Sequence, residues 1–127
     1  MKRLPKPPVQ SEYDAQKAIF KWADIMSEKW PVLRFLNSSA NGVRVSIGLA
    51  NKLKAAGLKA GYPDIFLPVS KMGFHGLFIE LKRKKGGKAS PAQLGWIDFL
   101  IGQGYHATIC YGKSDAIWEI RQYLGIE

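Results

Sequence analysis

The chain has little cysteine: among its 127 residues only Cys110 carries a thiol. No internal disulfide can form, and there is no thiolate cluster to bind zinc or an iron–sulfur centre. The sequence also lacks any run of about 18 apolar residues, and no apolar segment follows its basic N-terminal residues. We therefore expect a cytoplasmic protein that neither spans a membrane nor carries a signal peptide.

Acidic residues are also few. Asp and Glu total 10 against 19 Lys and Arg, which gives a formal net charge of +9 and a pI near 9.8. Such an excess of positive charge favours a polyanionic partner, and nucleic acid is the leading candidate. The alternative is a basic surface that serves only solubility.

The length and composition indicate one folded domain. With 46% hydrophobic residues the chain can form one core, and at 127 residues it is too short for two. Residues 1–10 hold three prolines and three basic residues without periodicity, which predicts a flexible basic arm. The single domain should then run over residues 11–127.

Capping and periodicity predict four helices. Ser11 begins a helix over about 11–29, Ser46 begins one that ends at Gly57, and Ser90 with Gln93 forms a capping box for a third. Apolar residues of the third helix, Leu94, Ile97 and Ile101, are predicted to be buried. Ser114 is predicted to cap the last helix.

Strands are predicted between these helices. The alternating VLRFL stretch after Pro31 is expected to form a short strand, and NSSANG (37–42) a loop. Residues 64–69 and 74–82 should form a hairpin, and YHATICYG (105–112) a further strand. The order α-β-α-β-β-α-β-α favours an α/β fold, with a small mixed sheet between helices.

Three polar side chains lie in the predicted hairpin. Glu80 and Lys82 are two residues apart and share one face of their strand. Asp64 opens the neighbouring strand, so its carboxylate can approach that of Glu80, and two such carboxylates repel unless a cation lies between them.

Hard oxygen ligands of this kind select Mg²⁺ or Mn²⁺, and the Leu81 carbonyl is a further candidate ligand. Lys82 could orient or activate an attacking water, or stabilise the charge of the transition state. The three side chains therefore predict a metal site for phosphodiester hydrolysis. Taken singly, E-x-K is ordinary sheet surface and Pro-Asp is a common turn signal, so the prediction depends on their combination.

The stretches GYPDIFL, GLFIELKR and GGKASPAQLGWIDFL resemble the VRR-NUC domain of the PD-(D/E)XK nuclease superfamily, in its short stand-alone form from phages and bacteria. The resemblance extends from the Ser11 helix to about Gly112 and implies a restriction-endonuclease-like core. It assigns metal binding to Asp64 and Glu80 and catalysis to Lys82. The valine-arginine-arginine stretch that names the family is absent here, where Leu81–Lys82–Arg83 stands instead.

Two further site residues follow from the resemblance. The family tends to place an acid on its first helix, where this chain has Glu12, which would reach the metal directly or through water. Its glutamine on the helix after the E-x-K strand corresponds to Gln93. Simpler roles account for both residues, because an acid favours a helix start and a glutamine three residues after Ser90 completes a capping box.

Basic residues lie around the predicted site. Arg83, Lys84, Lys85 and Lys88 follow the E-x-K strand, in a loop with two glycines that can follow a nucleic-acid backbone, or they form a solvated charge run. Arg44 and Lys52 are candidates for a second patch that contacts nucleic acid.

We expect a Mg²⁺-dependent, structure-selective DNA endonuclease without a small-molecule cofactor. The resemblance implies a four-way (Holliday) junction resolvase of a bacterial or phage-infected cell, which leaves a 5′-phosphate and acts as a homodimer. A flap, nicking or restriction-like endonuclease would use the same residues. A non-catalytic basic DNA-binding protein is the alternative outside enzymes.

Overall fold

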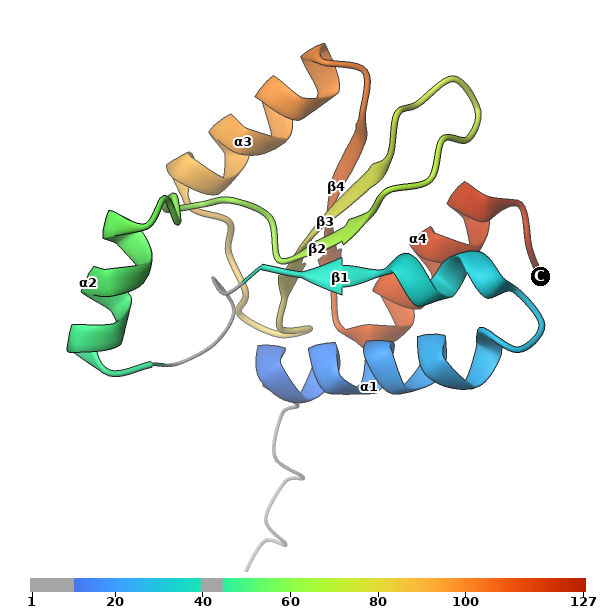
Figure 1. Ribbon diagram of the computed structural model, residues 1–127, viewed down its shortest axis with the longest axis horizontal. Helices are drawn as coiled ribbons and strands as arrows, with labels where there is room; N and C mark the ends of the chain where they lie inside the picture. Colours follow the sequence, from blue (N-terminus) through green and yellow to red (C-terminus); the bar gives the residue numbers. More distant parts are fainter. Residues whose placement is uncertain (1–10, 40–44) are drawn as a thin grey trace, which may run out of the picture.

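The computed structural model describes residues 11–39 and 45–127 and contains one four-stranded sheet (Figure 1). The predicted arm and Arg44 lie outside these residues. The strands lie in the order of their sequence: β1 (Asn37–Ser38), β2 (Ile65–Leu67), β3 (Leu77–Lys82) and β4 (His106–Tyr111). β1, β2 and β3 pair antiparallel, whereas β3 and β4 pair parallel. The predicted mixed sheet is confirmed.

Helices cover both faces of the sheet (Figure 1). α3 (Pro91–Gly102) packs on one face, and α1 (Glu12–Met26) and α4 (Lys113–Leu124) pack on the other. α2 (Ile47–Ala55) stands at the side of the body and buries no residue. No helix in the described part of the chain is both long and apolar enough to cross a bilayer.

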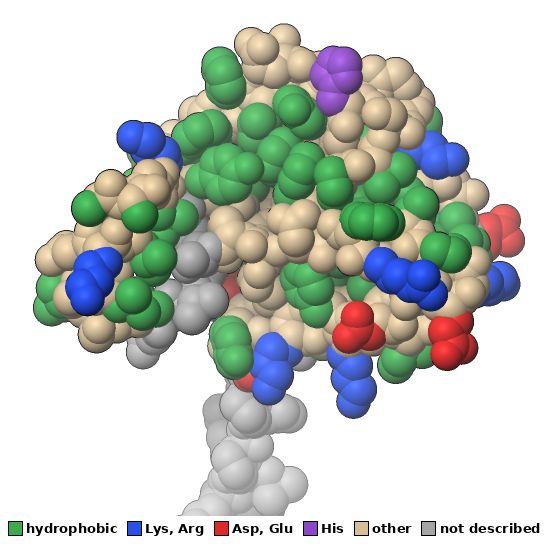
Figure 2. All heavy atoms as spheres, viewed as in Figure 1, with side chains coloured by type: hydrophobic (Ala, Val, Ile, Leu, Met, Phe, Trp, Pro, Cys, Tyr) green, Lys and Arg blue, Asp and Glu red, His purple; other side chains and the backbone are tan. Residues whose placement is uncertain are grey.

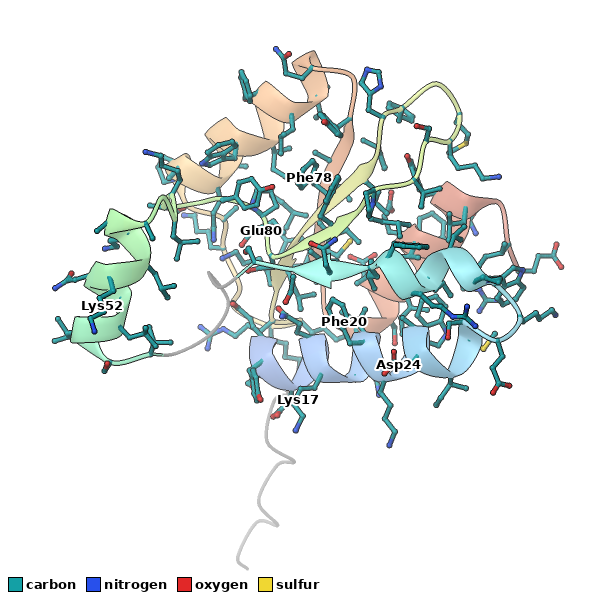
Figure 3. The ribbon with its side chains drawn as sticks, in the orientation of Figure 1. Lys17, Phe20, Asp24, Lys52, Phe78 and Glu80 are labelled. Carbon is teal, nitrogen blue, oxygen red and sulfur yellow. The ribbon has the colours of Figure 1, made fainter. Side chains whose placement is uncertain are left out.

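The central strand β3 separates two clusters of buried side chains. Its residues Leu77, Ile79 and Leu81 join the larger cluster, with α1 and α4, whereas Phe78 joins the cluster under α3. On α1, Phe20 points toward the sheet while Lys17 and Asp24 point away (Figure 3). Because side chains alternate along a strand, Glu80 and Lys82 share the face of Phe78. Their strand is nevertheless buried at all six positions.

The predicted helix caps at Ser11, Ser46 and Ser90 are confirmed. The Ser11 and Ser46 hydroxyls accept the backbone N–H groups of Asp14 and Leu49. At Ser90 both bonds of the capping box are present. These bonds satisfy N–H groups that a helix leaves free in its first turn, which explains why the serines mark the starts of helices.

The predicted strand VLRFL is wrong. Pro31–Phe35 forms a 3₁₀ helix, η1, and the strand that follows is only Asn37–Ser38, within the predicted loop. A 3₁₀ helix repeats every three residues, so Leu33 and Leu36 lie on one buried side at 2% and 7% exposure. Phe35, which an alternating pattern would place with Leu33, is 63% exposed.

Two helix details also differ from prediction. α4 begins at Lys113 after Gly112, and Ser114 does not cap it; Asp115 Oδ2 instead accepts the Tyr111 N–H at 2.8 Å. In α3, Ile97 is buried as predicted, but Leu94 and Ile101 are 46% and 52% exposed. α3 is apolar nearly all round, so periodicity could not select its buried face.

Gly61 lets the chain pass close to α3. Its φ is +84°, and a Cβ atom there would lie 2.6 Å from the backbone carbon of Ala92. Trp96 Nε1 on α3 donates a hydrogen bond to the Ala60 carbonyl at 3.2 Å, beside this contact. The segment that leads to Asp64 is thereby held against the first half of α3.

We predict opposite effects of alanine at two glycines. Gly61→Ala should lower the free energy of unfolding by about 1–3 kcal/mol, because it adds both backbone strain and overlap. Gly95→Ala in α3 should raise it by about 0.5–1 kcal/mol, because a Cβ there meets nothing within 4 Å and alanine favours a helix. Urea unfolding of both variants tests this pair. Equal effects at the two positions would contradict it.

Candidate active site

The two predicted acids lie on adjacent strands. β2 and β3 pair with Ile65 opposite Ile79, so extending the register by one residue places Asp64 opposite Glu80. Asp64 is 5% exposed and Glu80 is 2% exposed, and Lys82 on the same face is 8% exposed. Figure 3 shows Glu80 at the sheet, on the side of α3. The structure therefore brings together Asp64, Glu80 and Lys82.

Each acid has a hydrogen-bond donor. Asp64 Oδ2 accepts the Leu81 backbone N–H at 2.7 Å. Glu80 Oε1 accepts Gln93 Nε2 at 2.7 Å, and Lys82 Nζ lies 3.8 Å from the same oxygen. Glu80 Oε2 is buried and has no partner among the described residues. A buried carboxylate oxygen without a partner is costly, so this atom is the natural position for a bound cation.

Gln93 has both of the roles that its sequence position allowed. Its Oε1 accepts the Ser90 backbone N–H at 2.8 Å, which completes the capping box. Its Nε2 donates to Glu80 at 2.7 Å. The helix cap fixes the orientation of the amide, so α3 presents a donor to the acidic pair from a rigid element.

Burial dominates the electrostatics of the acids. Burial, followed by the negative charge of Asp64, raises the pKa of Glu80 to about 9. Burial also raises the pKa of Asp64, although the Leu81 N–H opposes that shift. The positive charge of Lys82 lowers both pKa values, but it does not cancel these larger effects. The protein alone therefore does not hold both groups ionised near neutral pH.

Glu12 affects the site from α1. Its negative charge contributes to the raised pKa of both Asp64 and Glu80, so it lies within electrostatic reach. Among the described residues, however, no three His, Cys, Asp or Glu side chains gather closely enough to form a metal cluster. Direct coordination by Glu12 stays a prediction, and a bridging water would span the remaining distance.

The donor set fits a hard divalent cation. Two carboxylates, one with an unsatisfied oxygen, supply the charge that Mg²⁺ or Mn²⁺ requires. Such an ion keeps several waters, so two carboxylates and a backbone carbonyl such as that of Leu81 are enough protein ligands. A cation here would also favour the ionised form of both acids.

The predicted nucleic-acid contacts occupy different surroundings. Arg83, Lys84, Lys85 and Lys88 are exposed in the loop after β3, where Gly87 packs against Arg83 so closely that a Cβ would lie 2.6 Å from its carbonyl oxygen. The loop therefore folds back against the end of β3, beside Lys82. Lys52 is exposed on α2, which stands at the side of the body (Figure 3). All five remain predicted contacts.

The sequence reasoning missed Tyr111 and Lys113, which line a pocket with the predicted Lys84 and Lys85. Tyr111 stands beside Lys82 because β3 and β4 pair parallel. The strand after α3 was predicted, but its partner and register were not, so nothing connected Tyr111 with the E-x-K motif. An exposed tyrosine that ends a strand was the only local signal.

Comparisons with known proteins identify the family and the fold. The model of the VRR-NUC domain matches residues 10–114. A solved structure described as "VRR_NUC domain protein" is similar with a TM-score of 0.79 and 30% sequence identity, over 94% of this chain and 93% of that chain. No curated protein sequence matches this chain significantly.

We predict that the metal-free protein loses stability as the pH rises. The pKa of Glu80 is 4.5 for the free side chain and about 9 in the fold, so the folded state binds more protons across that interval. Its unfolding free energy should therefore fall from about pH 4.5 to 9. Glu80→Gln should remove much of this slope and stabilise the protein at pH 7 by up to about 3 kcal/mol.

Urea unfolding in EDTA from pH 5 to 8 measures this effect. The variant retains an acceptor for Gln93, so its packing should change little. Glu28→Gln, at an exposed acid, is the matched control and should follow the wild type. If Glu80→Gln also keeps the full wild-type slope, the buried acid is not the group that titrates.

Proposed function

Because the chain belongs to the VRR-NUC domain family of nuclease-type domains, we propose that it is a metal-dependent endonuclease that cuts branched DNA, with the four-way junction as its preferred substrate. The observation that carries this proposal is the buried pair Asp64 and Glu80. One oxygen of Glu80 has no partner among the described residues, and Lys82 lies on the same face. This arrangement suits a cation and a phosphodiester, and it has no evident structural benefit.

Asp64 and Glu80 would hold Mg²⁺, with Mn²⁺ as a substitute, and the Leu81 carbonyl and Glu12 are further candidate ligands. When bound, the ion supplies Lewis acidity to the phosphate and lowers the pKa of a coordinated water. The bond from the Leu81 N–H keeps Asp64 Oδ2 in place, and Gln93 keeps Glu80 Oε1 in place. Both acids are thus oriented before substrate binds, which lowers the cost of reaching the reactive geometry.

Lys82 is proposed to act on the phosphate or on the attacking water. Its ammonium group lies 3.8 Å from Glu80 Oε1. Little solvent surrounds it, because the Lys82 side chain is only 10% exposed. A positive charge in such a dry site stabilises the extra negative charge of the transition state more than it would in water. The exposed lysines of the 83–88 loop would hold the flanking DNA backbone.

We also propose that the protein acts as a homodimer through α3. This helix has one charged residue, Asp98, in the middle of its exposed side; Leu94 and Ile101 lie along one flank of that side and Phe99 along the other, and they are 46%, 52% and 58% exposed. In Figure 2 hydrophobic side chains gather over α3 and the neighbouring strands. Large apolar side chains left exposed along both flanks of a helix are typical of a contact surface, and a second copy would place two sites against two opposed strands.

Cleavage of defined DNA substrates tests the proposed activity. A labelled four-way junction should receive paired symmetric cuts with Mg²⁺ or Mn²⁺ and none with EDTA. Asp64→Asn, Glu80→Gln and Lys82→Met should each lower the rate by about 100- to 1,000-fold, because each removes charge that contacts the reacting group or its metal. Lys71→Met, at an exposed lysine on the hairpin turn, should leave the rate unchanged.

Other outcomes separate the alternatives. Preferred cutting of a flap, or single cuts in duplex DNA, would replace the resolvase assignment with a flap, nicking or restriction-like endonuclease. Binding without cleavage under any metal, unchanged in Asp64→Asn, would indicate a DNA-binding accessory protein.

We predict that Phe99→Asp disrupts the dimer. A buried charge without a partner in the α3 contact should shift the protein to a monomer in sedimentation measurements. The monomer should nick one strand of the junction, so paired cuts should separate in time. Ile25→Asp, at a 64% exposed position of α1, is the control and should stay dimeric. A wild-type monomer at the concentrations of the cleavage assay would exclude this interface.

A further inference from the structure

A cavity of about 430 Å³ opens where β3 and β4 end, and neither the metal site nor the dimer proposal uses it. Its walls include Tyr111 at the end of β4, Lys84 and Lys85 in the loop after β3, and Lys113 and Ser114 in the first turn of α4. Its volume lies in the range of ligand-binding pockets, about 300–1,000 Å³. We call it the Tyr111 pocket.

The Tyr111 pocket lies next to the candidate active site. In the parallel pairing of β3 and β4, Tyr111 is the partner of Lys82. Paired residues on neighbouring strands project to the same face, and the strands lie about 4.8 Å apart. A phosphodiester held at Lys82 would therefore have its neighbouring nucleotide within reach of the Tyr111 ring.

The wall of the pocket combines an aromatic ring with positive charge. Tyr111 is 43% exposed, and its ring contacts no other ring among the described residues. Its backbone is held, because its N–H donates to Asp115 Oδ2 at 2.8 Å. Three lysines outnumber Asp115, the one acid in the pocket wall. An aromatic face beside several lysines is suited to a base that stacks and a phosphate that pairs with ammonium groups.

We propose that the Tyr111 pocket binds one unpaired nucleotide of the substrate strand, next to the scissile phosphate. The base stacks on Tyr111, and the phosphate of that nucleotide contacts Lys84, Lys85 or Lys113. A base in duplex DNA would first have to leave its stack, at a cost that is least where bases are already unpaired. The pocket thus gives a physical reason for selecting branch points, and in this sense it rests on the proposed function.

Fluorescence of 2-aminopurine tests stacking directly and without cleavage. DNA carrying this base at an unpaired position beside the branch is titrated with protein in EDTA. Wild type and Tyr111→Phe should quench the fluorescence, whereas Tyr111→Ala should not. Loss of the ring should also weaken binding of this DNA by about 5- to 100-fold and leave binding of matched duplex unchanged. Lys113→Ala should weaken binding to both and reduce the slope of log affinity against log salt by about one.

Phe35→Ala is the matched control. Phe35 is also an exposed aromatic residue, at 63% exposure, but it lies next to β1, at the edge of the sheet opposite β4 and Tyr111. It should behave as wild type. If Tyr111→Ala retains the quenching, or weakens duplex binding equally, the nucleotide assignment is wrong. Preferential capture of an acidic peptide over the branched DNA would also overturn it.

The same titration separates the two proposals. Quenching that depends on Tyr111, in a protein that cuts no substrate, supports the pocket and contradicts the nuclease. Cleavage of branched DNA with Mg²⁺, equal in wild type and Tyr111→Ala, supports the nuclease and overturns the pocket.

Discussion

The cost of ionising two buried acids side by side is the constraint on which this molecule depends. Asp64 and Glu80 lie on adjacent strands, almost without solvent; burial raises the pKa of both, and the negative charge of Asp64 raises the pKa of Glu80 further. The protein supplies one backbone N–H, one amide and one ammonium group, and it leaves one oxygen without a partner among the described residues. A divalent cation at this position would favour the ionised form of both acids.

The surrounding fold holds the two acids next to each other. β3 uses its alternation to place Leu77, Ile79 and Leu81 in the main core while the acid and lysine face α3. The close contact at Gly61 and the hydrogen bond from Trp96 to the Ala60 carbonyl hold the segment before Asp64 against that helix. The amide that caps α3 then reaches Glu80. Core packing, helix capping and the candidate site are thus parts of one contact between a strand and a helix.

Local signals predicted the elements that depend on local chemistry. A serine that satisfies free N–H groups marks a helix start, and Lys71–Gly73 forms the predicted turn of the hairpin between β2 and β3. Sequence patterns gave the wrong prediction where one sequence is compatible with two structures. VLRFL alternates, but its leucines three apart fit a 3₁₀ helix, and α3 is apolar on too many sides to show which of them is buried. Ser114 does not cap the last helix, because the turn at Gly112 starts α4 one residue before it, at Lys113.

The sequence by itself determined the residue types and spacing of the candidate site: an acid at the start of one strand, an acid and a lysine two residues apart on the next, and a glutamine on a capped helix. These follow from the two-residue period of strands and the chemistry of helix starts, which act over a few residues. Only the tertiary structure decided that Gln93 reaches Glu80 while capping α3, and that Tyr111 stands beside Lys82. The first depends on how α3 packs on β3, and the second on the parallel pairing of β3 with β4. Packing of the whole domain sets both, rather than neighbouring residues.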